Sequence, residues 1–310
     1  MTSASVAGDT GRRPIIDQLR VVPGANADLA GRDTRWTGGG VYDGLSTDEL
    51  DAAAKSIVAD GIEELQDAQE LLWASSTYAV LVVFQAMDAA GKDSTIKHVM
   101  SGVNPQGVHV VSFKQPSSQE LDHDFLWRIS KALPARGEIG IFNRSQYEEV
   151  IALRVHPEWL DNQNLPPGDH GPDFWAGRYE DLNAFERHLD RTGTKIVKFF
   201  LHVSKTEQKR RFMARLDNPN KLWKFSAGDV AVRAHWDEYM QSFEDAITAT
   251  STDWAPWYVI PADHKHVMQA MVARILVDRI GSLPHEWPTV SEEDRAANAK
   301  ARQQLEAEPD

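Results

Sequence analysis

Five apolar runs of strand length recur along the chain, with helix-like segments between them. Their positions are 78–85 (YAVLVVFQ), 108–113 (VHVVSF), 139–142 (IGIF), 195–202 (KIVKFFLH) and 257–260 (WYVI). A continuous apolar run is typical of a parallel strand, because helices cover both faces of a parallel sheet. Such runs in alternation with helices predict an α/β fold built on one open parallel sheet.

Helical patterns fill the intervals between these runs. Ser46 and Glu49 form a capping-box pattern at the start of a helix predicted over 46–74, in which Gly61 is a candidate break. A second helix is predicted over 120–133, where apolar residues recur every four positions.

The composition limits the classes of function. The chain of 310 residues is 42% hydrophobic and 25% charged, as in ordinary globular proteins. Its formal net charge is −13, whereas a general nucleic-acid binder is more often basic. The absence of cysteine excludes disulfides and thiolate zinc sites. No apolar run reaches about 18 residues, and the first residues lack a secretory pattern. We therefore expect a cytoplasmic protein that binds neither nucleic acid nor membranes.

The turn after the first apolar run resembles a phosphate-binding loop, G-x-x-x-x-G-K-[ST]. Gly91 and Lys92 fit this pattern, while Ala86 replaces the first glycine and Asp93 replaces the final Ser or Thr. The loop also has the required context, with a strand before it and a helix after it. Backbone N–H groups would face an anion, and the Lys92 ammonium would add positive charge. The backbone candidates are Ala89, Ala90, Gly91, Asp93 and Ser94.

Two carboxylates compensate for the missing hydroxyl, which normally binds Mg²⁺. Asp88 and Asp93 offer hard oxygen ligands, and we expect them to hold Mg²⁺, with Mn²⁺ as the alternative, directly or through water. The other interpretation is an ordinary strand-to-helix turn, in which Asp93 interacts with the helix dipole.

The third apolar run is followed by Asn143 and Arg144, where enzymes with phosphate-binding loops usually hold a second acid near the metal. Asn143 can accept a hydrogen bond from metal-bound water, and Arg144 can bind phosphate oxygens through two N–H groups. Ligands of open α/β sheets bind at these carboxyl ends of strands. The other interpretation of Arg144 is a surface ion pair with Glu148.

The segment 205–224 is basic in an otherwise acidic chain. Seven basic residues stand against two acidic ones, a local balance of +5. The segment follows a predicted strand and begins with a capping-box pattern at Ser204 and Glu207. It is similar to mobile lids that close arginines over phosphates, and many cations suit a long polyanion. A solvated basic helix is the alternative. The lid candidates are Arg210, Arg211, Arg215, Lys221 and Lys224.

In this order, the elements resemble the polyphosphate kinase 2 family over about residues 15–285. The resemblance rests on FQAMDAAGKDSTIKHVMSGVNPQGV, ELDHDFLWR, GEIGIFNRSQYEEV, RLDNPNKLWKFS and APWYVIPADHK. It implies a thymidylate-kinase-like, three-layer P-loop kinase fold with a parallel central sheet and a helical lid. It also implies Mg²⁺-dependent, reversible phosphoryl transfer between inorganic polyphosphate and a nucleotide. The IFNRS sequence resembles the branch that acts on both AMP and ADP.

The resemblance also implies residue roles. Asp88, Lys92 and Arg144 match the catalytic positions, and Asn143 and the lid cations match substrate-binding positions. Arg128 matches a residue of the nucleotide pocket. A homo-oligomer is implied as well.

The expected organisation has three parts. They are an extended N-terminal arm (1–45) packed loosely on the body, a P-loop phosphotransferase domain (46–285) with its lid at about 205–228, and a polar C-terminal tail (286–310).

Two rival functions remain open. An ATP-dependent nucleotide kinase on the same scaffold would need a pocket for the donor base, whereas a polyphosphate donor needs an extended basic track. The basic segment favours the track. A non-catalytic polyphosphate or nucleotide sensor would use the loop for binding only, and the acids around Lys92 argue against it.

Overall fold

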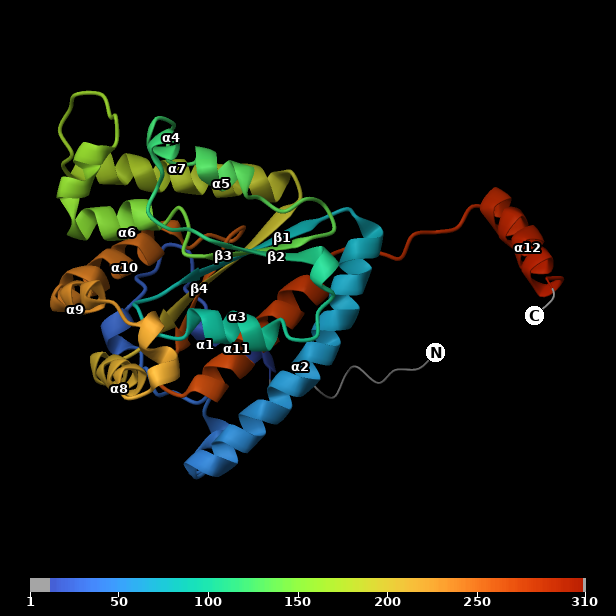
Figure 1. The fold of residues 1–310 in the computed structure, drawn as a ribbon, viewed down its shortest axis with the longest axis horizontal. Helices are drawn as coiled ribbons and strands as arrows, with labels where there is room; N and C mark the ends of the chain where they lie inside the picture. Colours follow the sequence, from blue (N-terminus) through green and yellow to red (C-terminus); the bar gives the residue numbers. More distant parts are fainter. Residues whose placement is uncertain (1–11, 309–310) are drawn as a thin grey trace.

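The computed structural model describes residues 12–308 and has one five-stranded sheet at its centre (Figure 1). The strand order is β2-β3-β1-β4-β5, and each neighbouring pair is parallel. The strands are β1 (Ala79–Gln85), β2 (Val108–Ser112), β3 (Ile139–Asn143), β4 (Thr194–His202) and β5 (Trp257–Pro261). The predicted α/β fold with a parallel central sheet is confirmed.

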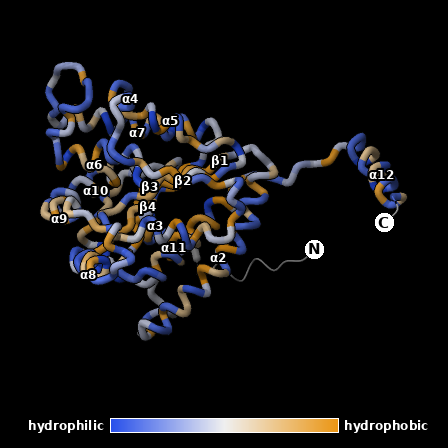
Figure 2. The backbone as a smooth tube through the Cα atoms, in the orientation of Figure 1, coloured by the Kyte–Doolittle hydropathy of each residue, from blue (hydrophilic) through white to orange (hydrophobic). Residues whose placement is uncertain are grey.

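The strands carry the hydrophobic core. All seven residues of β1 are buried, and the Phe84 ring stacks on Phe199 of β4 with a centroid separation of 5.1 Å. Figure 2 shows that hydrophobic residues concentrate along the strands at the centre of the molecule. Each fully buried large apolar side chain stabilises the fold by about 1.5–3 kcal/mol, so the sheet is a rigid base for the loops at its ends.

Helices cover both faces of the sheet, as Figure 1 shows. The helices on one face are α1 (Arg12–Leu19), α2 (Thr47–Ser75), α3 (Lys92–Val99) and α11 (Lys265–Gly281). The helices on the other face are α4 (Ser118–Leu121), α5 (Trp127–Lys131), α6 (Glu148–Val155), α7 (Pro172–Arg191) and α10 (Trp236–Thr250). The basic segment forms α8 (Lys205–Leu216), a 3-10 turn η5 (Pro219–Lys224) and α9 (Ala227–Ala234).

The predicted first helix is correct, but its glycine is not a break. The Ser46 hydroxyl accepts the Glu49 N–H, and the Glu49 carboxylate accepts the Ser46 N–H at 2.9 Å, so the capping box is present. The helix α2 continues through Gly61, where an added Cβ would lie 3.4 Å from the Ala273 Cβ of α11. Gly61 therefore permits close packing of the two helices.

The single helix predicted over 120–133 is wrong. The chain forms two short helices instead, α4 and α5, with a break between them. In this break the Asp124 carboxylate accepts the Leu126 N–H at 2.9 Å. A short polar side chain that bonds the backbone two residues ahead competes with helix formation, and the apolar spacing does not reveal it.

The N-terminal arm packs more closely than predicted. Leu19 and Val21 are buried, and the Val21 N–H donates to the Trp257 carbonyl of edge strand β5 at 2.9 Å. The Glu244 carboxylate accepts the N–H groups of residues 28 and 29, each at 2.7 Å. Residues 1–11 of the expected arm lie outside the described part of the chain.

The C-terminal tail contains α12 (Glu292–Glu306), which lies apart from the body and is exposed along its length (Figure 1). Residues 309–310 of the expected tail lie outside the described part. Between residues 12 and 308, no helix has both the length and the apolar character needed to cross a membrane.

Candidate active site

A large cleft opens at the carboxyl ends of the strands, with a volume of about 1730 Å³. Segments that follow β1, β2, β3 and β5 contribute its floor, and the α8–α9 segment contributes a wall. Ligands of open parallel sheets bind at this end, because the loops that follow the strands all lie at the same edge of the sheet.

The loop after β1 has the backbone geometry of a tight anion-binding turn. Gly91 has a φ of 117° and directly precedes α3, and Ala89 has a φ of 62°. A positive φ is uncommon for a residue with a side chain and costs about 1–3 kcal/mol, so the surroundings must hold Ala89 in this conformation. The first N–H groups of α3 lack helical acceptors and suit an anion.

Lys92 is the first residue of α3 and lines the cleft. Its ammonium donates to the Ala86 carbonyl at 2.8 Å, which holds the side chain back over the loop. Burial lowers the pKa of Lys92, and the neighbouring Asp88 carboxylate partly opposes this effect. A phosphate placed in the loop would give this ammonium a further anionic partner beside the Ala86 carbonyl and Asp88.

Asp88 and Arg144 form a pair across the floor of the cleft. The Arg144 guanidinium donates to the Asp88 carboxylate at 2.9 Å, and it lies 3.8 Å from Glu148. These carboxylates, Glu148 first, raise the pKa of Arg144. Arg144 also has a φ of 64°, and its N–H donates to the Phe84 carbonyl of β1 at 3.1 Å. The predicted ion pair with Glu148 is present, but Arg144 still lines the cleft.

The second predicted carboxylate also has a partner from β3. The Asn143 amide donates to the Asp93 carboxylate at 2.7 Å, and both residues line the cleft. Within residues 12–308, no group of three or more His, Asp or Glu side chains is arranged to hold a metal. Two separate carboxylates fit Mg²⁺ all the same, since this ion is usually bound by one or two carboxylates together with water and substrate phosphates.

The wall formed by α8, η5 and α9 brings the lid cations to the same cleft. Arg210 bonds Glu207 and leaves 69% of its side chain exposed, and Arg215 reaches the Lys224 carbonyl at 3.4 Å. The cleft-lining cations of this wall are Arg210, Arg211, Arg215, Lys221 and Lys224. The structure therefore brings the predicted loop, the predicted β3 residues and the predicted basic segment together around one space.

Comparison with known proteins agrees with this geometry. The family model of polyphosphate kinase 2 matches residues 49–286, which is most of the chain. The chain belongs to the polyphosphate kinase 2 family. It is therefore a phosphotransferase with a P-loop kinase fold.

Relatives of this polyphosphate kinase 2 chain match it at similar levels of identity. The ADP-polyphosphate phosphotransferase of Rhodopseudomonas palustris is 50% identical over 245 residues, covering 79% of this chain and 85% of the relative. The AMP/ADP-polyphosphate phosphotransferase of Meiothermus ruber is 49% identical over 224 residues, covering 72% of this chain and 80% of the relative. The crystal structure of a polyphosphate kinase 2 from Arthrobacter aurescens superposes with a TM-score of 0.82 at 40% identity, covering 93% and 96% of the two chains.

Two predicted site residues of this polyphosphate kinase 2 do not line the cleft. Arg128 is partly buried beside the segment that follows β2, where it donates to the Lys114 carbonyl at 2.9 Å and lies 3.9 Å from Glu149. Its partners Phe113 and Lys114 line the cleft, and its place in a nucleotide pocket stays a prediction. Ala90 is 1% exposed, and its carbonyl accepts a bond from Arg211, so it supports the loop from beneath.

Part of the cleft is formed by residues that were not predicted from the sequence. Residues 112–115 after β2, residues 263–266 after β5, and Trp223 of η5 all line it. The rule used for Asn143 would have found the first two segments, because both follow predicted strands at the same edge of the sheet. Trp223 has no such signal.

Proposed function

We propose that this polyphosphate kinase 2 transfers phosphoryl groups reversibly between inorganic polyphosphate and AMP or ADP, forming ADP and ATP with Mg²⁺. The observation that carries the proposal is the shared cleft. The loop residues Lys92 and Asp88 lie at its floor with Arg144, and the lid cations form its wall. A single phosphate needs few cations, whereas a chain of phosphates needs a basic track of this extent.

Phosphoryl transfer of this kind depends on positioning and on charge stabilisation, without a covalent enzyme intermediate. Lys92 and the loop N–H groups would hold one phosphate, and Arg144 would neutralise charge that develops on the transferred group. Asp88 and Asp93 would hold Mg²⁺, which would supply positive charge to neutralise the phosphates. The Arg144 and Asn143 side chains orient these two carboxylates.

The relatives support the choice of acceptors. One relative is named for ADP and the other for AMP and ADP, and each is about half identical to this chain. We propose both acceptors for this protein. Its homo-oligomeric state and cytoplasmic location stay predictions.

A donor-exchange assay tests the proposal. The purified protein is incubated with Mg²⁺ and AMP, ADP, GMP or GDP, with either polyphosphate or ATP as donor, and products are separated by chromatography. We expect polyphosphate to support turnover of AMP and ADP. Turnover with ATP but not with polyphosphate would favour the ATP-dependent kinase. Saturable binding of polyphosphate without turnover would favour the sensor.

A further inference from the structure

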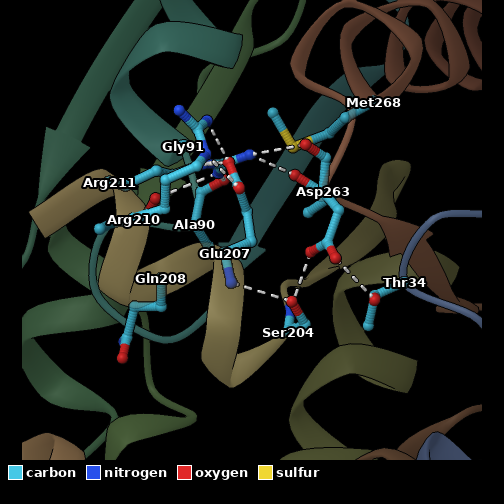
Figure 3. Close-up of polar contacts among 12 residues, drawn as sticks. Thr34, Ala90, Gly91, Ser204, Glu207, Gln208, Arg210, Arg211, Asp263 and Met268 are labelled. Carbon is cyan, nitrogen blue, oxygen red and sulfur yellow. Dashed lines mark hydrogen bonds and ion pairs between the residues drawn. The ribbon is translucent and has the colours of Figure 1, made fainter. Parts of the chain in front are cut away.

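The Arg211 side chain of α8 contacts the phosphate loop, and all of its N–H groups donate to other residues of the protein (Figure 3). Its Nη1 donates to the carbonyls of Ala89 at 3.1 Å and Ala90 at 2.5 Å. Its Nη2 donates to the carbonyls of Ala262 at 2.5 Å and Asp263 at 3.3 Å. Its Nε donates to Glu207 at 2.7 Å. A guanidinium has five N–H donors, so none of them remains for a phosphate.

Gln208 holds the preceding residue of the loop in the same way. This residue is 1% exposed, and its side-chain amide donates to the Asp88 carbonyl at 2.9 Å. Its amide oxygen accepts from Arg233 of α9 at 2.8 Å. The carbonyls of residues 88, 89 and 90 therefore all accept hydrogen bonds from α8. This pattern has a physical reason, since a loop that turns its N–H groups toward an anion must turn carbonyls away from it, and those carbonyls need donors.

The start of α8 is itself fixed to the sheet. The Asp263 carboxylate, just after β5, accepts the Ser204 N–H at 2.8 Å and the Thr34 hydroxyl at 2.9 Å, as Figure 3 shows. Glu207 does not complete the predicted capping box with Ser204. Its carboxylate instead holds Arg211 and Arg210, the latter through two bonds of 2.6 Å. The first turns of α8 thus form one body with the loop and with the end of β5.

We propose that Arg211 is a positioning residue, which acts through the phosphate loop and does not contact the phosphates. With Gln208 it orients the peptide groups of residues 88–91, including the strained Ala89. The Ala90 N–H donates to the Met87 carbonyl at 3.3 Å, and the N–H groups of Ala89 and Gly91 are left for an anion in the cleft. One consequence concerns the predicted lid of 205–228. Its first half is part of the rigid site, and any closing motion must begin after Arg211. The expected changes in kcat and KM rest on the proposed function, whereas the positioning of the loop by Arg211 does not.

The test compares Arg211→Gln and Arg211→Lys with Lys209→Gln, a control that removes an exposed cation from the same helix. A lysine keeps the charge but cannot reproduce the planar fork that contacts four carbonyls. The first measurement is loop exchange without substrate, taken as hydrogen exchange of the Ala90 and Thr95 amides, which donate to the Met87 carbonyl at 3.3 Å and the Gly91 carbonyl at 2.9 Å. The second is the separate effect on kcat and on KM for polyphosphate, with ADP as acceptor.

We expect exchange in the loop to rise by about tenfold or more in both Arg211 variants, because charge-assisted bonds are lost. We also expect kcat to fall by roughly 10²-fold in both, while KM for polyphosphate changes by less than about threefold. The Lys209→Gln protein should match the wild type in both measurements.

Two results would overturn the proposal. The first is unchanged loop exchange in Arg211→Gln. The second is a normal kcat in Arg211→Lys together with a rise of about tenfold in the KM of Arg211→Gln for polyphosphate, which is the pattern expected if Arg211 contacts a phosphate directly. If the wild type shows no turnover, the proposed function fails, and the exchange measurement still decides the role of Arg211. If Arg211→Gln does not fold, Gln208→Met removes the donor to Asp88 and must itself raise loop exchange for the proposal to stand.

Discussion

Gly91→Ala is the perturbation whose effect follows most directly from the geometry of the loop. Gly91 has a φ of 117°, a region that residues with side chains rarely adopt. An added Cβ would also lie 3.0 Å from the Met268 Cε and 3.5 Å from the Ser94 hydroxyl. Met268 is fully buried in α11, so its methyl group has little room to retreat.

The expected loss of stability is the sum of these two effects. The strained φ costs about 1–3 kcal/mol, and the tight contact adds about 1 kcal/mol if Met268 shifts by a few tenths of an ångström. We therefore expect a loss of about 2–4 kcal/mol of unfolding free energy, which for a chain of 310 residues corresponds to roughly 3–6 °C in Tm. A displacement of the loop by about 1 Å would reduce kcat by roughly 10²-fold.

The assay measures thermal unfolding and ATP formation from ADP and polyphosphate. Gly177→Ala is the matched control, because Gly177 lies within α7 and nothing lies within 4 Å of an added Cβ there. That variant should gain about 0.5–1 kcal/mol from helix propensity and keep its activity. A Gly91→Ala protein with a Tm within about 1 °C of the wild type and normal turnover would show that the loop tolerates a side chain at this φ.

Three further predictions follow from single residues of the site and the core. Lys92→Ala should lower kcat by about 10²–10³-fold with little change in Tm, and normal turnover would exclude its catalytic role. Asp88→Asn should raise the Mg²⁺ concentration for half-maximal activity by at least about tenfold, and an unchanged Mg²⁺ titration would exclude Asp88 as a metal ligand. Burial lowers the pKa of His202 from 6.5 to about 4, with the Asp263 carboxylate opposing this and Arg32 reinforcing it. The unfolded chain therefore takes up the His202 proton first as pH falls, and between pH 6.5 and 4 the wild type should lose about 3 kcal/mol more stability than His202→Gln. Denaturant unfolding across this range checks the last prediction, and parallel pH profiles would contradict it.

The sheet could be predicted from the sequence because its signal is local and strong. Each strand is a continuous apolar run, and the run at 78–85 leads directly into the glycine-lysine turn. The rule that ligands bind at the carboxyl ends of strands then placed Asn143 and Arg144 beside the loop, as the structure has them.

Contacts between segments far apart in the sequence could not be predicted in this way. The sequence shows that Arg211 belongs to a basic helix, but charge alone does not reveal that its donors face the carbonyls of residues 89 and 90. Arg128 illustrates the same limit, since the sequence does not show that it donates to the Lys114 carbonyl and lies over the Phe113 ring. In a sequence, an arginine that binds a ligand cannot be distinguished from one that donates to carbonyls of the protein itself.

The central claim is that the cleft transfers phosphoryl groups from polyphosphate to a nucleotide. The measurement that tests it most directly is ADP formation from AMP in a reaction that contains polyphosphate and Mg²⁺ but no ATP, with wild type and Lys92→Ala compared at equal concentration. We predict rapid ADP formation by the wild type and nearly none by the variant. No ADP formation by the folded wild type, or equal formation by both proteins, would contradict it.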